Sequence, residues 1–202
     1  MPSSPDIQNI RQLETLTALL IFVLAMSGCA GALFKVKPVI DLPPMRDSAK
    51  SVSGGGLNLR AAVLMTDEES QDLFEANLPI AGLLPLRIEL VHESGVPVEL
   101  KKARFHLRDS EGREWKLLSP KAATARILKA NDVYAYNPNS RKQFEKEFAT
   151  YDIDLKTPLS DSNPRRQGFL FFQSPDKQPV TSPRGLILSV DRLPQPLEVQ
   201  LN

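Results

Sequence analysis

Short runs of alternating apolar and polar residues recur from Leu57 almost to the end of the chain. In one run Leu86, Ile88 and Leu90 alternate with charged residues, and a period of two places such apolar side chains on one face of a β-strand. Clusters rich in Gly, Pro, Asn and Asp separate the runs and indicate turns. The predicted strands lie near residues 57–65, 86–90, 98–108, 114–118, 151–155, 167–173, 185–190 and 197–201. This pattern predicts a mainly β domain, an antiparallel sandwich of seven to eight strands.

A segment with helical periodicity interrupts the predicted strands at about residues 119–150. The pair Ser119-Pro120 favours a helix start, because proline suits the first position of a helix. In a second predicted helix Phe144 and Phe148 lie four residues apart, on one side. The sequence therefore predicts a two-helix insertion within the β domain.

The only cysteine of the chain, Cys29, follows an apolar run at residues 16–26. That run is too short for a membrane-spanning helix, which needs about 20 residues, and it fits the core of a signal peptide, which needs about 7–15. The sequence Met26-Ser27-Gly28-Cys29 is typical of a lipobox. It predicts cleavage between Gly28 and Cys29, with a diacylglycerol and an N-acyl lipid on the new terminal cysteine and no other cofactor.

Two alternatives to the lipobox stay open. The segment is a cleaved secretory signal with an incidental cysteine, or it is an uncleaved apolar anchor that extends to Phe34. With the lipobox interpretation, Ala30 and Gly31 after the cysteine are typical of lipoproteins sorted to the outer membrane. We therefore expect a lipid-anchored protein of the bacterial cell envelope, on the outer membrane and facing the periplasm.

The chain divides into three predicted parts. Residues 1–28 are the signal peptide, residues 29–56 the lipidated cysteine with a flexible tether, and residues 57–202 the β domain. Prolines and the glycine-rich run Ser51–Gly56 are the reason for predicting a tether. A lipidated Cys29 leaves the domain no disulfide, so its stability must come from its core.

Three stretches of the β domain resemble a known group of proteins. They are Leu86–Leu100, with the turn Glu93-Ser94-Gly95; Phe105–Gly112, which ends in Asp-Ser-Glu-Gly; and Gly168–Phe172. They are similar to the immunoglobulin-like, telokin-like domains of uncharacterised bacterial lipoproteins. The resemblance implies an immunoglobulin-like β-sandwich and brings no catalytic residues with it. The chain differs from the group at His92-Glu93 and in the helical segment.

Charge and motifs point away from nucleic acid and from recognisable catalysis. The net charge is +1 for the whole chain, which lacks the strongly basic footprint of nucleic-acid-binding proteins. His92 and His106 have no metal-ligand spacing and are interpreted as solvated strand residues. Asp109 and Glu111 are placed at a hairpin tip, screened by solvent. We therefore predict no catalytic residues, no metal site and no enzyme.

Two groups of residues are candidates for binding. Basic residues crowd one hairpin, at Lys101, Lys102, Arg104, Arg108 and Arg113, and we favour a solvated strand face over a site for anionic partners. Aromatic residues gather in and after the helical insertion, at Tyr134, Tyr136, Phe144, Phe148 and Tyr151. Aromatic side chains are enriched at protein interfaces. For Phe144 and Phe148 we favour a core role that closes an open end of the sandwich.

These observations lead to two functional hypotheses. The first is a non-catalytic module that binds or assembles with another envelope protein through the helical insertion, while its lipid holds it at the membrane. The second is a periplasmic carrier or sensor that holds a small apolar or lipid-like ligand between the sandwich and the helices. A buried apolar pocket supports the carrier, and a solid core supports docking.

Overall fold

The computed structural model describes residues 34, 36–39, 42–93, 95–131 and 138–202. Within these residues the chain forms eight strands and three helices. The strands are β1 (Lys50–Gly54), β2 (Leu57–Val63), β3 (Leu83–His92), β4 (Arg104–Arg108), β5 (Glu114–Leu118), β6 (Arg165–Gln173), β7 (Ile187–Asp191) and β8 (Leu197–Gln200). The helices are α2 (Asp67–Phe74), α3 (Pro120–Ala130) and α4 (Pro138–Ala149). The mainly β character and the two helices of the insertion are confirmed.

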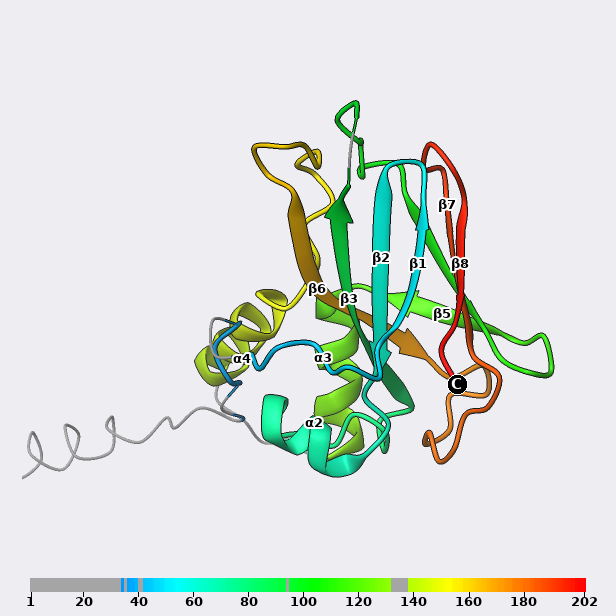
Figure 1. Ribbon diagram of the computed structural model, residues 1–202. Helices are drawn as coiled ribbons and strands as arrows, with labels where there is room; N and C mark the ends of the chain where they lie inside the picture. The colour runs from blue at the N-terminus through cyan, green and yellow to red at the C-terminus, as the bar shows by residue number, and fades with distance from the viewer. Residues whose placement is uncertain (1–33, 35, 40–41, 94, 132–137) are drawn as a thin grey trace, which may run out of the picture.

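The strands form one antiparallel sheet in the order β1-β2-β3-β6-β5-β4-β7-β8. The sheet curls until β1 and β8, its two edges, lie side by side, which makes it nearly barrel-shaped (Figure 1). The predicted antiparallel pairing is therefore confirmed for a single continuous sheet. The immunoglobulin-like sandwich stays a prediction.

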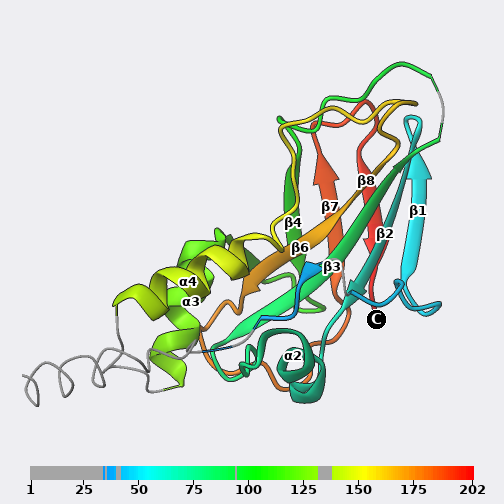
Figure 2. The same cartoon turned by 90° about the vertical axis from the view of Figure 1, so that its left-hand side faces the viewer.

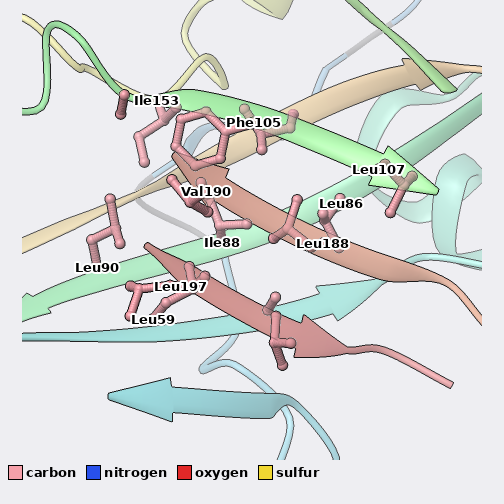
Figure 3. Close-up of a cluster of buried hydrophobic side chains, with 14 of the residues drawn as sticks. Leu59, Leu86, Ile88, Leu90, Phe105, Leu107, Ile153, Leu188, Val190 and Leu197 are labelled. Carbon is pink, nitrogen blue, oxygen red and sulfur yellow. The ribbon is translucent and has the colours of Figure 1, made fainter. Parts of the chain in front are cut away.

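The inside of the curled sheet holds the first hydrophobic core. Leu86, Ile88 and Leu90 of β3 point into it, and Phe105 of β4 and Val190 of β7 meet them from the opposite wall (Figure 3). These side chains are the apolar members of the period-two runs, so the alternation in the sequence correctly predicted which faces are buried. The core fills the curled sheet with side chains.

A second hydrophobic core lies on the outer face of β3 and β6, beneath the helices (Figure 2). Its centre is a cluster of aromatic rings, at Phe74, Phe144, Phe148, Tyr151, Phe169 and Phe171. The rings of Phe148 and Phe171 are closest, with centroids 4.5 Å apart. Strand β6 sends Phe169 and Phe171 into this cluster and Leu170 and Phe172 into the first core.

Gly168 lets the chain leaving α4 run directly beside β6. A Cβ atom at this position would lie 2.7 Å from the Cα of Ile153, closer than real side chains approach. The Phe169 amide donates to the Tyr151 carbonyl at 2.7 Å. Residues 151–155, predicted as a strand, therefore make only an isolated bridge between Asp152 and Phe169. The predicted strand at 98–108 is confirmed only over β4, and its first part is reduced to one bridge, between Val98 and Leu159.

The prediction of a flexible tether is wrong for the described residues before residue 57. The glycine-rich run is a β-hairpin, because β1 pairs with β2 and the turn residues Gly55 and Gly56 have φ of +59° and +77°. Glycine favours such left-handed conformations, which explains why a hairpin turn resembles a linker in sequence. The domain therefore begins before residue 57.

The residues before β1 are also bound to the fold. The Phe34 ring lies 5.0 Å from the Phe144 ring, and Val36 and Met45 are buried. The Lys37 amide donates to the Leu73 carbonyl at 2.9 Å. Apolar side chains on either side of the prolines, together with this hydrogen bond, thus hold the segment against α4 and α2, where a tether would be free.

Hydrogen exchange tests this arrangement. We expect the Lys37 amide to exchange at least about tenfold more slowly than an unbonded amide, because local opening must precede exchange. Phe34→Ala removes the contact with Phe144 and should increase that exchange rate by about tenfold, for about 1.4 kcal/mol of lost packing. Asp72→Ala is the control: it breaks only the exposed Lys37–Asp72 ion pair and should change the opening free energy by less than about 1 kcal/mol. If the Lys37 amide exchanged as fast as an unbonded amide, the segment would not be bound to the fold and the prediction of a flexible tether would stand.

Candidate functional site

Several predicted site residues lie outside the described residues. These are the lipidation and cleavage residues Cys29 and Gly28, and the tyrosines Tyr134 and Tyr136. Their roles stay predictions. The described chain begins at Phe34, and residue 131 and Pro138 flank the segment with the two tyrosines.

The other three candidate binding residues are in the second core. Phe144 and Phe148 are fully buried and Tyr151 is 1% exposed. The Tyr151 hydroxyl donates to the Lys37 carbonyl, so this side chain helps to fix the N-terminal segment. The four-residue spacing that suggested a contact stripe instead turns both phenylalanines toward the sheet. In this conformation none of the three side chains is available to a partner. Phe144 and Phe148 are core residues, but they cover the outer face of the sheet at Phe171 and do not close an open end of a sandwich.

Helices α3 and α4 together form a helical layer with a basic outer face. Both helices bury one side in the second core, through Ile127 of α3 and Phe144 of α4, so their opposite sides share an outward direction. The exposed residues that define this outer face are Lys121, Ala125, Lys129, Lys142 and Lys146. Among the described residues no ion-pair partner is found for these four lysines. The face is not apparent in the sequence, because the lysines come from two separate helices.

Charge is divided between the helices. Helix α3 has three basic residues and no acidic one, and α4 has three basic and two acidic residues. One basic residue of α4 is neutralised, because Arg141 pairs with Glu145 at 2.7 Å. Helix α2 has four acidic residues and no basic one. The helices therefore give the domain a basic side at α3 and α4 and an acidic side at α2.

A buried group of charges lies on the outer face of β2, β3 and β6. Glu89 is 3% exposed, receives a hydrogen bond from Arg60 at 3.2 Å and pairs with Arg165. Arg87 is also buried and donates to the Pro43 carbonyl at 2.7 Å. Burial lowers the pKa of the Arg87 guanidinium, and the Glu89 carboxylate opposes that shift. These charges hold neighbouring strands and the N-terminal segment together.

Arg87 also forms one wall of a small cavity beneath that segment. The cavity holds about 90 Å³, and its other walls include Pro43, Met45, Leu73 and Phe169. Ligand pockets for small molecules are typically about 300–1,000 Å³. The space is therefore too small for a lipid-like ligand in this conformation.

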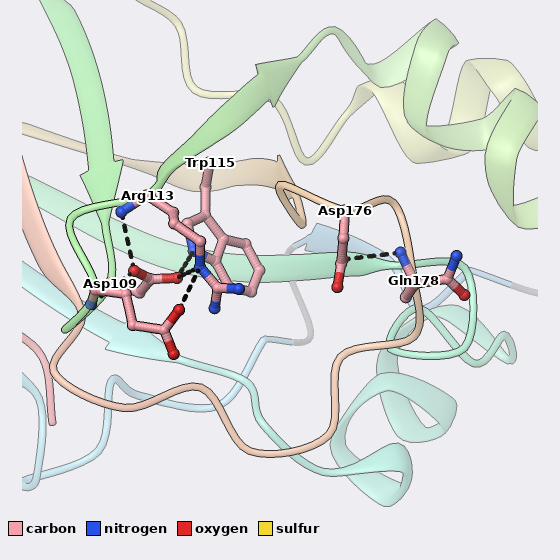
Figure 4. Close-up of polar contacts among 6 residues, drawn as sticks. Asp109, Arg113, Trp115, Asp176 and Gln178 are labelled. Carbon is pink, nitrogen blue, oxygen red and sulfur yellow. Dashed lines mark hydrogen bonds and ion pairs between the residues drawn. The ribbon is translucent and has the colours of Figure 1, made fainter.

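Asp109 organises the basic hairpin and corrects one expectation. It is 7% exposed, where the sequence suggested a solvent-screened carboxylate. Its Oδ1 accepts from the amides of Glu111 and Arg113 at 3.0 Å, and its Oδ2 from the Arg113 side chain at 2.9 Å and the Trp115 indole at 3.4 Å (Figure 4). Burial by itself would raise the pKa of Asp109, but these hydrogen bonds outweigh it and hold the pKa below its ordinary value.

Arg104 and Arg108 lie on the exposed face of β4, as favoured, whereas Lys101 and Lys102 are exposed in the turn before it. Arg108 lies 3.7 Å from Glu198 of β8, and Arg104 donates to the Ala103 carbonyl. Of the two histidines, His106 is exposed, but His92 is buried and its Nδ1 lies 3.1 Å from Asp161. The expectation of a solvated His92 is therefore wrong, because the segment after Asp161 covers the end of β3.

Comparison of the chain with protein-family models, curated proteins and solved structures gives no match. None of the helices that the structure describes combines the length and apolar character needed to cross a bilayer. The part of the chain that the structure describes also contains no group of three or more His, Cys, Asp or Glu side chains placed to hold a metal ion.

Replacing Asp109 should destabilise the domain in a pH-dependent way. We expect Asp109→Asn to lower the free energy of unfolding by about 2 kcal/mol at neutral pH, because buried donors lose a charged acceptor. The folded pKa is below the unfolded value, so the carboxylate's stabilisation is present above the ordinary pKa of 3.8 and is lost as the pH falls through the folded pKa.

Urea unfolding of the wild type and the variant across this pH range measures the effect. The difference in stability should shrink below about pH 4. Glu111→Gln is the matched control, since this neighbouring carboxylate is 68% exposed, and it should cost less than about 0.5 kcal/mol. A difference that does not change with pH would contradict the role of the Asp109 charge.

Proposed function

We propose that this protein is a lipid-anchored component of the bacterial cell envelope and acts as a non-catalytic binding or assembly module. The observation that carries the proposal is that the chain is already packed on the helical layer at Phe34, close in sequence to the predicted lipobox. Phe34 packs on Phe144 only five residues after Cys29. A lipid on Cys29 would thus be attached five residues from a fixed point of the domain.

The short connection limits how far the domain stands from the membrane. Five residues span at most roughly 18 Å when fully extended. A tether up to residue 56 would have allowed a much longer reach. The proposed protein therefore works close to the membrane surface, on the outer membrane and facing the periplasm. The lipid raises its effective concentration for membrane-bound partners.

The non-catalytic role is supported by what the titratable groups do. Asp109 holds a hairpin, Glu89 neutralises arginines between strands, and His92 pairs with Asp161. Each of these groups already has a structural task. The resemblance to lipoprotein domains favours an immunoglobulin-like fold, which often serves as a binding module.

A partner contact through the helical insertion is proposed for Tyr134 and Tyr136. The other three aromatic candidates are committed to the second core. The carrier hypothesis receives less support, because the cavity beside Arg87 holds only about 90 Å³, and the larger hollow of about 590 Å³ beside Leu117, Ile153 and Leu170 is open to solvent.

Lipidation is tested in the full chain expressed in a Gram-negative bacterium. Intact-mass measurement of the membrane fraction should show a chain that starts at Cys29 and carries diacylglycerol and an N-acyl group. Cys29→Ser should accumulate as the uncut chain without lipid, because the thiol is the acceptor. Ser27→Thr, a small polar change inside the motif, is the control and should still be processed. A mature chain cut at another position, with a free thiol or none, would refute the anchor.

Photo-crosslinking in cells tests the partner. A photoreactive residue at Tyr134 or Tyr136 should give one dominant protein adduct in the membrane fraction. The same residue at Ser51, an exposed site on β1, is the control and should not give that adduct. If the lipidated protein gives no adduct from either tyrosine, the assembly role fails and bound lipid should be sought in the purified protein.

A further inference from the structure

The outer face of the helical layer is the strongest unassigned surface of the described chain. Its four lysines lie opposite the buried sides of α3 and α4 and have no ion-pair partner among the described residues. Solvated surfaces usually mix both signs of charge, as the basic hairpin does with Arg108 and Glu198. On this face the exposed charges are of one sign.

Basic and apolar groups continue beyond the end of α3. Ile80 is 50% exposed and borders a shallow hollow of about 350 Å³ together with Arg126, Lys129 and Lys177. Arg126 donates to the carbonyls of Ala81 and Lys177, so it holds the two turns of this hollow in place. A large apolar side chain among cations is the combination that favours an anionic lipid surface.

The described chain begins at the same end of the molecule, next to α4. Phe34 packs against α4, and the preceding residues lead to Cys29 within roughly 18 Å. In Figure 2 the helical layer and β1 occupy opposite ends of the molecule. A lipid attached at Cys29 therefore brings α3 and α4, rather than β1 and β8, to the bilayer.

We propose that the outer face of the helical layer docks on anionic phospholipid headgroups and points the curled sheet away from the membrane. This inference rests on the proposed lipid anchor at Cys29. Clusters of Lys and Arg next to a membrane are attracted by anionic lipids within about one Debye length, which is about 8 Å at physiological salt. The short connection between Cys29 and Phe34 keeps the basic face close to the headgroups, near the distance over which they attract it.

The test uses the full lipidated protein in vesicles and one introduced thiol. Lipidation consumes the only natural thiol, so Ala125→Cys places the sole free thiol at the centre of the basic face without removing a charge. Ser51→Cys instead places the sole free thiol on β1, at the opposite end of the molecule. The rate of reaction with a membrane-impermeant maleimide is measured in vesicles with phosphatidylglycerol and in vesicles of phosphatidylcholine alone.

We expect the thiol of Ala125→Cys to react at least about tenfold more slowly in the phosphatidylglycerol vesicles, because several lysines together hold the face on the lipid. The thiol of Ser51→Cys should react at the same rate in both. High salt, or replacing the four lysines with Glu, should remove the difference.

Each other outcome overturns one proposal and can be told apart. Equal rates for Ala125→Cys in the two vesicle types, with the lipid on Cys29 confirmed by intact mass, would overturn the docking face and leave the anchor. Stronger protection of Ser51→Cys would place β1 at the membrane instead. A chain without lipid, which does not stay with the vesicles, would refute the proposed anchor itself.

Discussion

The whole structure depends on β6 having two apolar faces. Leu170 and Phe172 complete the core inside the curled sheet, and Phe169 and Phe171 complete the aromatic cluster beneath the helices. A strand buried on both sides must be covered on both sides, so the helical insertion is required by the sheet. Gly168 on the same strand leaves room for Ile153, which joins the core inside the curled sheet. The helices and the curled sheet are thus stabilised by one strand and are not independent parts.

Much of this architecture is predictable from sequence, because the determinants are local. The alternation in β3 identifies its inward face, the apolar run of β6 indicates a central strand, and Ser119-Pro120 marks the start of α3. The tether failed for a physical reason: glycines that allow a hairpin turn and glycines that make a linker look alike. Local composition does not show that Val36 and Met45 find apolar partners on elements later in the chain.

The polar part of the candidate site was beyond sequence reasoning for a related reason. Glu89 lies among Arg60 and Arg165, which come from neighbouring strands that are far apart in the chain. Only the register of β2, β3 and β6 brings them together. Asp109 was misplaced for the opposite reason: its partners are local, but its burial depends on how the hairpin folds back. When tertiary structure determines the partners of a charged side chain, the sequence alone does not show whether that side chain is free or paired.

The order of the N-terminal segment changes what a lipid anchor would do. A domain on a long flexible chain samples all orientations, so the lipid would set only its concentration near the membrane. A domain fixed through Phe34 and Lys37 has one side that must approach the bilayer, and the charges on that side then matter. Over an anionic surface, an orientation with the basic helical layer toward the membrane has a lower electrostatic energy than one with the acidic α2 toward it. With the proposed lipid on Cys29, the packing of a few apolar side chains at the start of the described chain would convert a simple attachment into a defined orientation.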